Sequence, residues 1–158
     1  MIKLINMSED NFIFFLNNAI HEFAEEKVKA NTWAEQEAIR LSEEAFNNLI
    51  PKGLNTDNTY FYLIFAEDIN KKIGYLWFKV FDGLLGKEAF LFDILIYEEF
   101  QGKGYGKKAM IAFEEKTSEL QINKLSLHVF GHNNIALELY KKIGYEITDI
   151  NMSKKIKY

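Results

Sequence analysis

Glycine residues at alternate positions stand out between residues 101 and 106, where the chain reads Gln-Gly-Lys-Gly-Tyr-Gly. An apolar run at residues 89–97 precedes this segment and a helix-favouring run at residues 107–120 follows it, which predicts a strand, a turn and a helix. Glycine lets the backbone approach an anion closely, and the first turn of a helix presents free N–H groups at the positive end of its dipole. The segment is typical of a phosphate-binding turn, although a plain surface loop before a helix has the same composition.

The spacing around this turn disfavours two nucleotide-binding motifs. Gly106 is followed by Lys107 and Lys108, so no hydroxyl is placed for magnesium as a Walker A loop requires. The dinucleotide fingerprint G-x-G-x-x-G requires its third glycine at the position of Lys107, and it normally opens a βαβ unit near the N-terminus. Nucleotide hydrolysis and a Rossmann domain are therefore not expected.

Composition limits the remaining classes of function. A chain of 158 residues with 48% apolar content is long enough for one core, so we expect one domain over residues 1–158. A net charge of -4 disfavours nucleic acid as a partner. Without cysteine, no acyl-cysteine intermediate can form. No apolar run is long enough for a membrane span and no signal-peptide pattern is present, so we expect a cytoplasmic protein without a membrane partner.

A second pattern follows the late apolar run at residues 124–130. Val129, Asn133, Ala136, Leu139-Tyr140 and Gly144-Tyr145 give V-x-x-x-N-x-x-A-x-x-L-Y-x-x-x-G-[FY]. Together with the turn at residues 101–106, this pattern resembles the GCN5-related N-acetyltransferase (GNAT) superfamily. Residues 24–30 and 124–130 are also similar to a subgroup of uncharacterised acetyltransferases from Gram-positive bacteria.

The resemblance implies a fold and a co-substrate. The fold is α+β in three layers, with a mixed, mostly antiparallel central sheet of six to seven strands and helices on both faces. The co-substrate is acetyl-CoA, and no metal is required. By the resemblance, backbone amides of the turn hold the CoA pyrophosphate, the free edge of the preceding strand pairs with pantetheine, and the later helix lies beside both. The expected cofactor-binding residues are Ile94, Leu95, Ile96, Gln101, Gly102, Lys103, Gly104, Tyr105, Gly106, Lys107, Asn133, Ala136 and Tyr140.

Periodicity and capping signals predict the elements that position these residues. Ser8 is a helix N-cap, Thr32 and Glu35 form a capping-box signature for a second helix, and Pro51 closes that helix. A polar turn at residues 68–71 predicts an antiparallel hairpin. The predicted strands are residues 2–6, 59–66, 73–81, 89–97, 124–130 and 145–156, and the predicted helices are residues 8–28, 32–49, 107–120 and 133–143.

Three residues are candidates for chemistry. The resemblance implies that Tyr140 is the general acid that protonates the departing CoA thiolate, although an aromatic residue at this helical position can also be core packing. An alkylammonium group has a pKa of about 10 and must lose a proton before it attacks. His128, Asp93 or an ordered water chain are the alternatives for the base: His128 lies on the strand face of Ser126, and Asp93 interrupts an apolar strand.

The resulting hypothesis is an acetyl-CoA-dependent N-acetyltransferase that acts on a primary amine, either a small amine or a protein amine. Direct attack in a ternary complex is expected because a cysteine nucleophile is absent. The alternative is a non-catalytic acyl-CoA-binding or sensing module. The spacing of His21, His128 and His132 gives no metal-ligand motif.

The acceptor pocket and the oligomeric state are also predicted. Acidic and aromatic residues of the first two helices and the hairpin suit an amine cation. The expected wall residues are His21, Glu22, Glu25, Glu26, Trp33, Tyr60, Tyr62, Trp77 and Phe78. A homodimer is possible, because the segment from Tyr145 to Tyr158 could supply an edge strand or finish the sheet within one chain.

Overall fold

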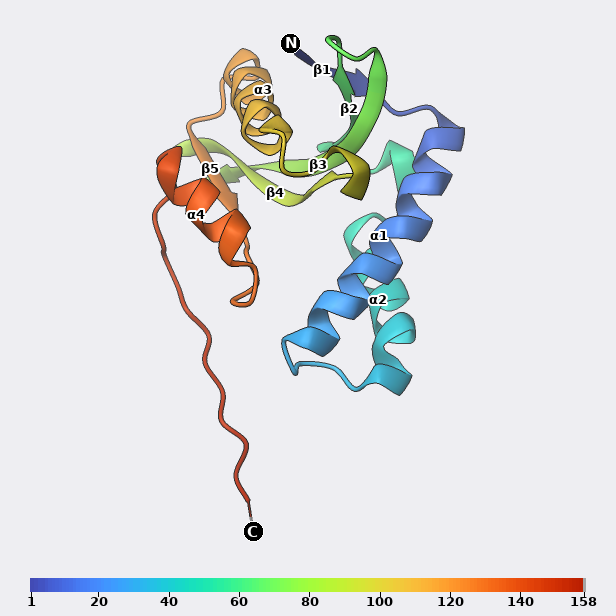
Figure 1. The fold of residues 1–158 in the computed structure, drawn as a ribbon, viewed down its shortest axis with the longest axis vertical. Helices are drawn as coiled ribbons and strands as arrows, with labels where there is room; N and C mark the ends of the chain where they lie inside the picture. The colour runs from blue at the N-terminus through green and yellow to red at the C-terminus, as the bar shows by residue number, and fades with distance from the viewer. Residues whose placement is uncertain (158) are drawn as a thin grey trace.

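The structure is a computed structural model that describes residues 1–157. Its elements follow an α+β order, in which one strand is followed by two α-helices, then by three successive strands, and then by an α-helix, a strand and a last α-helix (Figure 1). They are β1 Ile2–Asn6, α1 Glu9–Lys29, α2 Glu35–Leu49, η1 Gly53–Asn55, β2 Thr59–Ala66, β3 Lys71–Gly83, β4 Gly86–Ile96, η2 Glu98–Phe100, α3 Tyr105–Glu119, β5 Lys124–Leu127 and α4 Asn134–Lys142. The predicted limits of β1 and β2 agree with the structure.

The sheet has the strand order β1-β2-β3-β4-β5. β1 to β4 are antiparallel, and β5 lies parallel to β4. The described residues therefore form a mixed sheet of five strands, and the expected six to seven strands are wrong. The difference arises at residues 145–156, which form no strand because no other segment pairs with them. Tyr158 lies outside the described residues.

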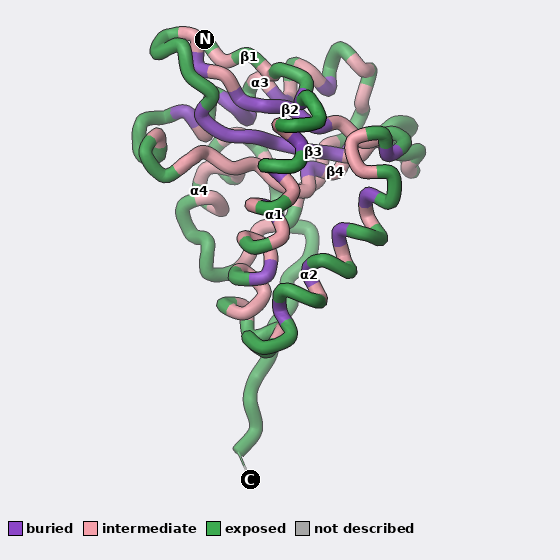
Figure 2. Tube along the Cα trace, turned by 90° about the vertical axis from the view of Figure 1, so that its right-hand side faces the viewer, coloured by how far each residue is buried: buried purple, intermediate pink, exposed green. Residues whose placement is uncertain are grey.

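Helices cover both faces of the sheet because alternate residues of its strands point to opposite sides. Tyr75 and Trp77 face α1 and α2, in a core with Phe15, Phe46 and Phe61. Leu76 and Phe78 face α3, in a core with Ala109, Met110 and Phe113, on which α4 packs Tyr140 and Ile143. Figure 2 shows this buried band across the strands. Among residues 1–157 no helix is long and apolar enough to cross a bilayer.

Helix starts differ in how well local signals predicted them. Ser8 caps α1 as expected, since its hydroxyl accepts a hydrogen bond from the Asn11 N–H at 3.2 Å and Asn11 Oδ1 accepts one from the Ser8 N–H at 3.1 Å. The predicted capping box of α2 is wrong. The Thr32 N–H instead donates to the Lys27 carbonyl at 2.9 Å, in the turn that ends α1, and α2 begins after Ala34 without a side-chain cap.

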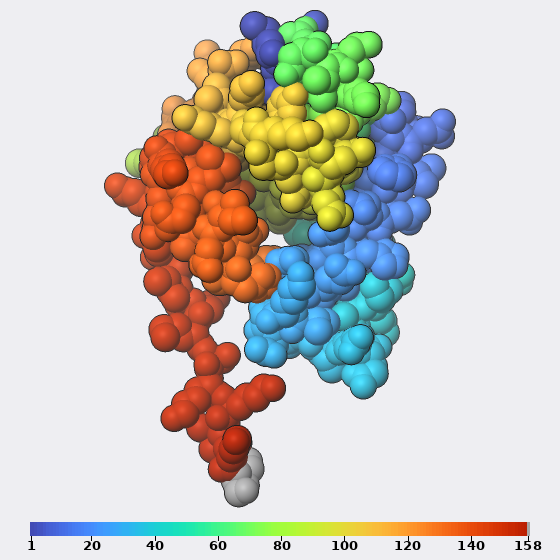
Figure 3. Space-filling view, viewed as in Figure 1, coloured from blue at the N-terminus to red at the C-terminus, as the bar shows by residue number. Residues whose placement is uncertain are grey.

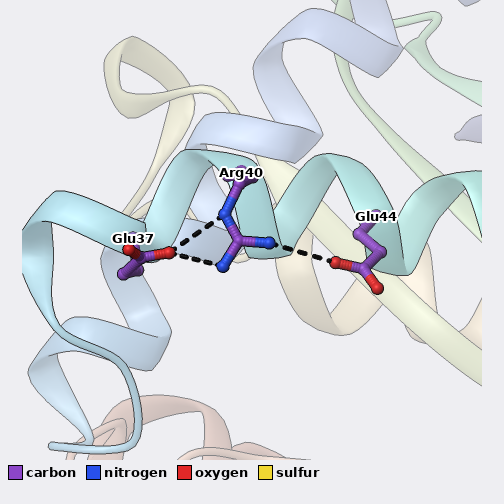
Figure 4. A network of polar contacts seen from close by, with 3 residues as sticks. All are labelled: Glu37, Arg40 and Glu44. Carbon is purple, nitrogen blue, oxygen red and sulfur yellow. Dashed lines mark hydrogen bonds and ion pairs between the residues drawn. The ribbon is translucent and has the colours of Figure 1, made fainter.

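The outer surface of α2 carries an exposed ion-pair network in which Arg40 bridges Glu37 and Glu44 (Figure 4). These side chains are three and four residues apart, as a helix surface requires for contact. Because all three are exposed to solvent, their contribution to stability is small. The network lies outside the cavity described below, so we assign it no role in chemistry.

Candidate active site

The sheet opens between β4 and β5. Their parallel pairing runs from Glu88 opposite Lys124 to Leu91 opposite Leu127, where β5 ends. β4 continues to Ile96, paired on its other side with β3. Within residues 1–157, no strand therefore pairs with the edge of residues 92–96 that faces β5, as the family resemblance implied. The predicted strand at residues 124–130 is three residues too long, and its last residues diverge from β4.

A cavity of about 480 Å³ occupies this opening. It brings together the three candidates for chemistry, Asp93, His128 and Tyr140. Tyr140 is also one of the five expected cofactor-binding residues in its wall, with Ile94, Leu95, Asn133 and Ala136. Ile96 and residues 101–107 are not part of its wall. Figure 3 shows a hollow with three boundaries: α1, the chain around α4, and the segment that precedes α3.

A β-bulge determines which way Asp93 points. Trp77 lies opposite Asp93 and the next residue, Phe78, lies opposite Leu91, so Phe92 is an extra residue in β4. Before the bulge, Ala89 and Leu91 face the α3 core, and after it Ile94 and Ile96 face that core. Simple alternation would have put Asp93 in the α3 core. The inserted residue instead places it on the cavity wall, where its charge interacts with α1.

Asp93 and Tyr140 have pKa values displaced in a way that suits proton transfer. Burial, with the nearby charges of Glu22 and Glu26, raises the pKa of Asp93 to about 7. Burial and the charge of Asp93 raise the pKa of Tyr140 to about 12. Near neutral pH the carboxylate can accept a proton, and the phenol keeps its own. No other described residue makes a hydrogen bond to the Tyr140 hydroxyl, which leaves it available to a ligand.

His128 lies at the outer part of the cavity, just beyond β5, and is exposed. Partial burial and the nearby charge of Lys27 lower its pKa below 6.5, so the imidazole is neutral at pH 7. Its ring packs edge-on against Phe130, with centroids 4.8 Å apart. A neutral imidazole in this position can accept a proton and exchange it with solvent.

The α1 side of the cavity is acidic. Glu22 and Glu26 line it, and burial together with neighbouring glutamates raises the pKa of Glu22. Glu26 Oε2 also lies 2.6 Å from His132 Nε2, which connects α1 to the loop before α4 across the cavity. This contact was not predictable from the sequence, because its partners are 106 residues apart.

Other expected wall residues of the acceptor pocket lie elsewhere. Tyr60, Tyr62 and Phe78 belong to the α3 core on the opposite face of the sheet, because they alternate with the residues that face α1. His21 Nδ1 lies 2.9 Å from the Asn17 carbonyl on the exposed side of α1. Glu25 and Trp33 are outside the cavity wall. Its aromatic surface comes from Trp77, as expected, and also from Phe23, Phe46, Phe90 and Phe92, which were not among the expected residues.

The glycine turn holds two residues in a conformation that favours glycine. Gly102 has φ +74° and Gly104 has φ +84°, and a Cβ on either would meet no other atom within 4 Å. α3 begins at Tyr105 rather than at residue 107, so Gly106 lies within its first turn. No side chain caps this helix start. Its first N–H groups are therefore left without a side-chain acceptor, which suits a phosphate group.

Side chains around the turn have structural contacts. The Tyr105 side chain is buried and its hydroxyl donates to Asp68 Oδ2 at 2.9 Å, so only its backbone is available at the turn. Gln101 Nε2 donates to the Ile96 carbonyl at 2.7 Å, and Lys103 Nζ donates to the Glu99 carbonyl at 3.3 Å. Lys107 is exposed.

Asn133 caps α4, since its Oδ1 accepts a hydrogen bond from the Ala136 N–H at 3.2 Å. Ala136 presents a small side chain to the cavity. The open turn, the free β4 edge and this small residue are the features to which the family resemblance assigned the binding of acetyl-CoA. Within residues 1–157 no group of three or more potential ligands is placed for a metal ion.

A mixed sheet that opens at a cavity, followed by a glycine turn at a helix start, is the architecture of a GNAT-type acetyltransferase. The model of the acetyltransferase (GNAT) family matches residues 17–145, and the chain belongs to this family. It is 39% identical to the uncharacterised N-acetyltransferase YycN of Bacillus subtilis over 157 residues, which are 98% of this chain and 99% of YycN. It is 38% identical to YdgE of the same organism over 153 residues, or 97% of each chain.

Solved structures agree with this family. The crystal structure of YycN superposes with a TM-score of 0.95 at 37% identity and covers 100% of both chains. A predicted acetyltransferase from Clostridium acetobutylicum, whose structure was determined with acetyl-CoA, has a TM-score of 0.64 at 14% identity and covers 98% of this chain and 96% of its own. At that identity the likeness concerns the fold alone.

Proposed function

We propose that this protein transfers the acetyl group of acetyl-CoA to a primary amine by direct attack in a ternary complex. Asp93 first takes a proton from the ammonium group, either directly or through water, and the neutral amine nitrogen then attacks the thioester carbonyl carbon. When the tetrahedral intermediate collapses, the C–S bond breaks, Tyr140 donates its proton to the departing thiolate, and the second proton lost by the nitrogen restores the Tyr140 phenol. His128, at the outer part of the cavity, returns the proton from Asp93 to solvent.

The observation that carries this proposal is the presence of Asp93 and Tyr140 in one cavity with pKa values of about 7 and about 12. Pairs of groups whose surroundings separate their pKa values are typical acid and base assignments. Glu22 and Glu26 support a cationic acceptor, because their carboxylates attract an ammonium group toward Asp93. The cavity walls of Trp77 and Phe92 suit the attached carbon chain.

The test is the release of free thiol from acetyl-CoA across a panel of polyamines, amino sugars and peptide N-termini. Tyr140→Phe should lower kcat by roughly 10²-fold or more and change acetyl-CoA binding much less, because the ring remains and only the hydroxyl is removed. Tyr145→Phe is the matched control, since Tyr145 packs 6.0 Å from Tyr140 but lies outside the cavity wall. Binding of acetyl-CoA without acceptor-dependent thiol release would support a binding or sensing module instead.

A further inference from the structure

Lys27 is the only lysine in the cavity wall that residues 1–157 form, and no arginine joins it there. Acetyl transfer as proposed uses Asp93, Tyr140 and His128 and gives Lys27 no part. Within residues 1–157 its ammonium group makes no ion pair or hydrogen bond, although α1 carries three glutamates among the five residues that precede it. A partly buried cation without an anionic partner is a candidate for binding a ligand.

Two aromatic rings hold the Lys27 ammonium group in place. Its Nζ lies 5.5 Å from the centroid of the Phe23 ring and 5.4 Å from that of the Trp33 ring. Both rings attract the cation electrostatically, and neither neutralises its charge. Lys27 therefore has a defined position and keeps its N–H groups available for an acceptor.

The carboxylate next to Lys27 in the chain, that of Glu26, already has other partners. Its Oε2 lies 2.6 Å from His132 Nε2, and its Oε1 lies 3.8 Å from Lys29 Nζ. Both oxygens of this carboxylate therefore contact groups other than Lys27. An anion for Lys27 has to come from a bound molecule.

Opposite charges belong to different parts of the cavity. The charges near Asp93 are those of Glu22 and Glu26, whereas the charge near His128, at the outer part, is that of Lys27. Lys27 follows Glu22 by five residues on α1, which is about 7.5 Å along the helix axis. A ligand that contacts both therefore needs a positive and a negative group separated by several atoms.

The phosphates of CoA suit Lys27 less well than a group on the acceptor does. The family resemblance assigns the pyrophosphate to the turn at residues 101–106, and those residues are not part of the cavity wall. α1 also packs on the face of the sheet opposite to α3, whose first turn follows the glycine turn.

We propose that Lys27 selects an acceptor that carries a carboxylate at the far end of an apolar chain from its amine, namely a small ω-amino carboxylic acid. This inference rests on the proposed function, because that function places the amine beside Asp93. The carboxylate accepts hydrogen bonds from the Lys27 ammonium group at the outer part of the cavity. The apolar chain lies against the aromatic surface of Phe90 and Phe92.

The first experiment measures thiol release from acetyl-CoA with four acceptors that share one carbon chain: 6-aminohexanoate, hexylamine, 1,6-diaminohexane and 6-aminohexanamide. The value of kcat/KM should be roughly tenfold or more higher for 6-aminohexanoate than for the other three, as one charge-assisted hydrogen bond allows. Equal values for all four acceptors would overturn the role of Lys27 and leave the proposed function standing.

Two variants test whether Lys27 causes this preference. Lys27→Met removes the charge and should abolish the preference, whereas Lys27→Glu should shift it toward 1,6-diaminohexane. Lys142→Met is the matched control, because Lys142 is exposed on α4 outside the cavity wall, and it should keep the preference. A preference that persists unchanged in both Lys27 variants would contradict the inference.

Isothermal titration calorimetry in the presence of CoA separates this inference from the proposed function, because CoA carries no acetyl group to transfer. Tighter binding of 6-aminohexanoate than of hexylamine, lost in Lys27→Met, supports the inference even where no acceptor is acetylated, a result that would count against the proposed function alone. If 6-aminohexanoate does not bind, or binds no better than hexylamine, Lys27 does not select the acceptor.

Discussion

At the scale of single residues, Asp93 is the position where several physical effects converge. It is a carboxyl group in an apolar strand, turned toward the cavity by the bulge at Phe92. The nearby charges of Glu22 and Glu26 disfavour its ionised form in the same direction as burial does. A cationic amine would relieve this repulsion, so substrate binding and proton acceptance at Asp93 are expected to be coupled.

The pH dependence of kcat/KM should distinguish Asp93 from His128 as the proton acceptor. Asp93 accepts a proton only when ionised, so activity should rise with pH through about 7. If His128 were the acceptor, the rise would lie below pH 6.5, because its pKa is lowered. Asp93→Asn should reduce kcat/KM by roughly 10²-fold or more and remove the rise, whereas His128→Gln should keep it. A rise that persists in Asp93→Asn would exclude Asp93.

Asp93→Asn, which should reduce kcat/KM, is expected to increase the stability of the folded protein above neutral pH. The pKa of Asp93 is higher in the folded protein than its ordinary value of 3.8, so the folded state prefers the protonated form. The contribution of Asp93 to the free energy of unfolding is fully present below pH 3.8 and is lost as the pH rises to about 7. This loss of unfolding free energy is on the order of 4 kcal/mol as an upper limit.

Because asparagine resembles the protonated acid, Asp93→Asn should raise the unfolding temperature at pH 8 and have little effect at pH 4. Thermal unfolding followed by circular dichroism at both pH values provides the measurement. Equal stability of the variant and the wild type at pH 8 would mean that the carboxylate is not destabilised by its surroundings.

Residues whose type conflicts with their local setting were recognisable in the sequence, whereas pairings between distant residues were not. Asp93 was a candidate because an unpaired carboxylate in an apolar strand is costly. The bulge at Phe92 has no glycine or other local signal, so the direction of the Asp93 side chain was not predictable. The contact between Glu26 and His132 depends on how two elements 106 residues apart meet.

At the scale of elements, the glycine turn allows a direct comparison of two neighbouring glycines. Gly104→Ala places a Cβ at φ +84°, which costs roughly 1–2 kcal/mol, and it should raise the KM for acetyl-CoA because the turn must change shape. Gly106→Ala lies in α3, where alanine is favoured, and its Cβ would make an ordinary contact with Leu139 at 3.6 Å. Steady-state kinetics and denaturant unfolding of both variants provide the measurements. An equal rise in KM in both variants would contradict a specific role for the shape of the turn.

The limits of helices and strands were predictable where the periodicity of apolar residues and the local capping residues indicated the same boundary. β1 and β2 have the predicted limits, and Ser8 begins α1 as expected. The error at Thr32 has a physical cause, since the turn that ends α1 uses its N–H group before α2 begins. α3 starts at Tyr105 because its buried side chain packs in the α3 core and bonds Asp68, which a glycine pattern alone does not indicate.

At the scale of the whole molecule, two cores share one sheet and the cavity lies where the sheet opens between β4 and β5. α1 supplies the acidic wall, and α4 supplies Ala136 and Tyr140. Sequence pattern predicted a strand at residues 145–156, but a pattern of alternating apolar residues specifies only that a segment suits a strand. It carries no information about whether a neighbouring strand is available to pair with that segment.

Acetyl-CoA should stabilise the molecule as a unit, because a ligand in the proposed site would contact β4, the start of α3 and α4 together. A ligand at 100 times its Kd adds about 2.7 kcal/mol to the free energy of unfolding. For a chain of this length, that corresponds to a rise in the unfolding temperature of roughly 5–10 °C.

Differential scanning fluorimetry with acetyl-CoA, ATP and NAD tests this expectation. Only acetyl-CoA should give the shift, because the turn lacks the hydroxyl of a Walker loop and the third glycine of a dinucleotide fingerprint. Gly104→Ala should reduce the shift, whereas Leu84→Lys, far from the turn in sequence and fully exposed, should retain it. A comparable shift with ATP or NAD would mean that the turn recognises phosphate alone, and the unpaired edge of β4 would then have no part in selecting the ligand.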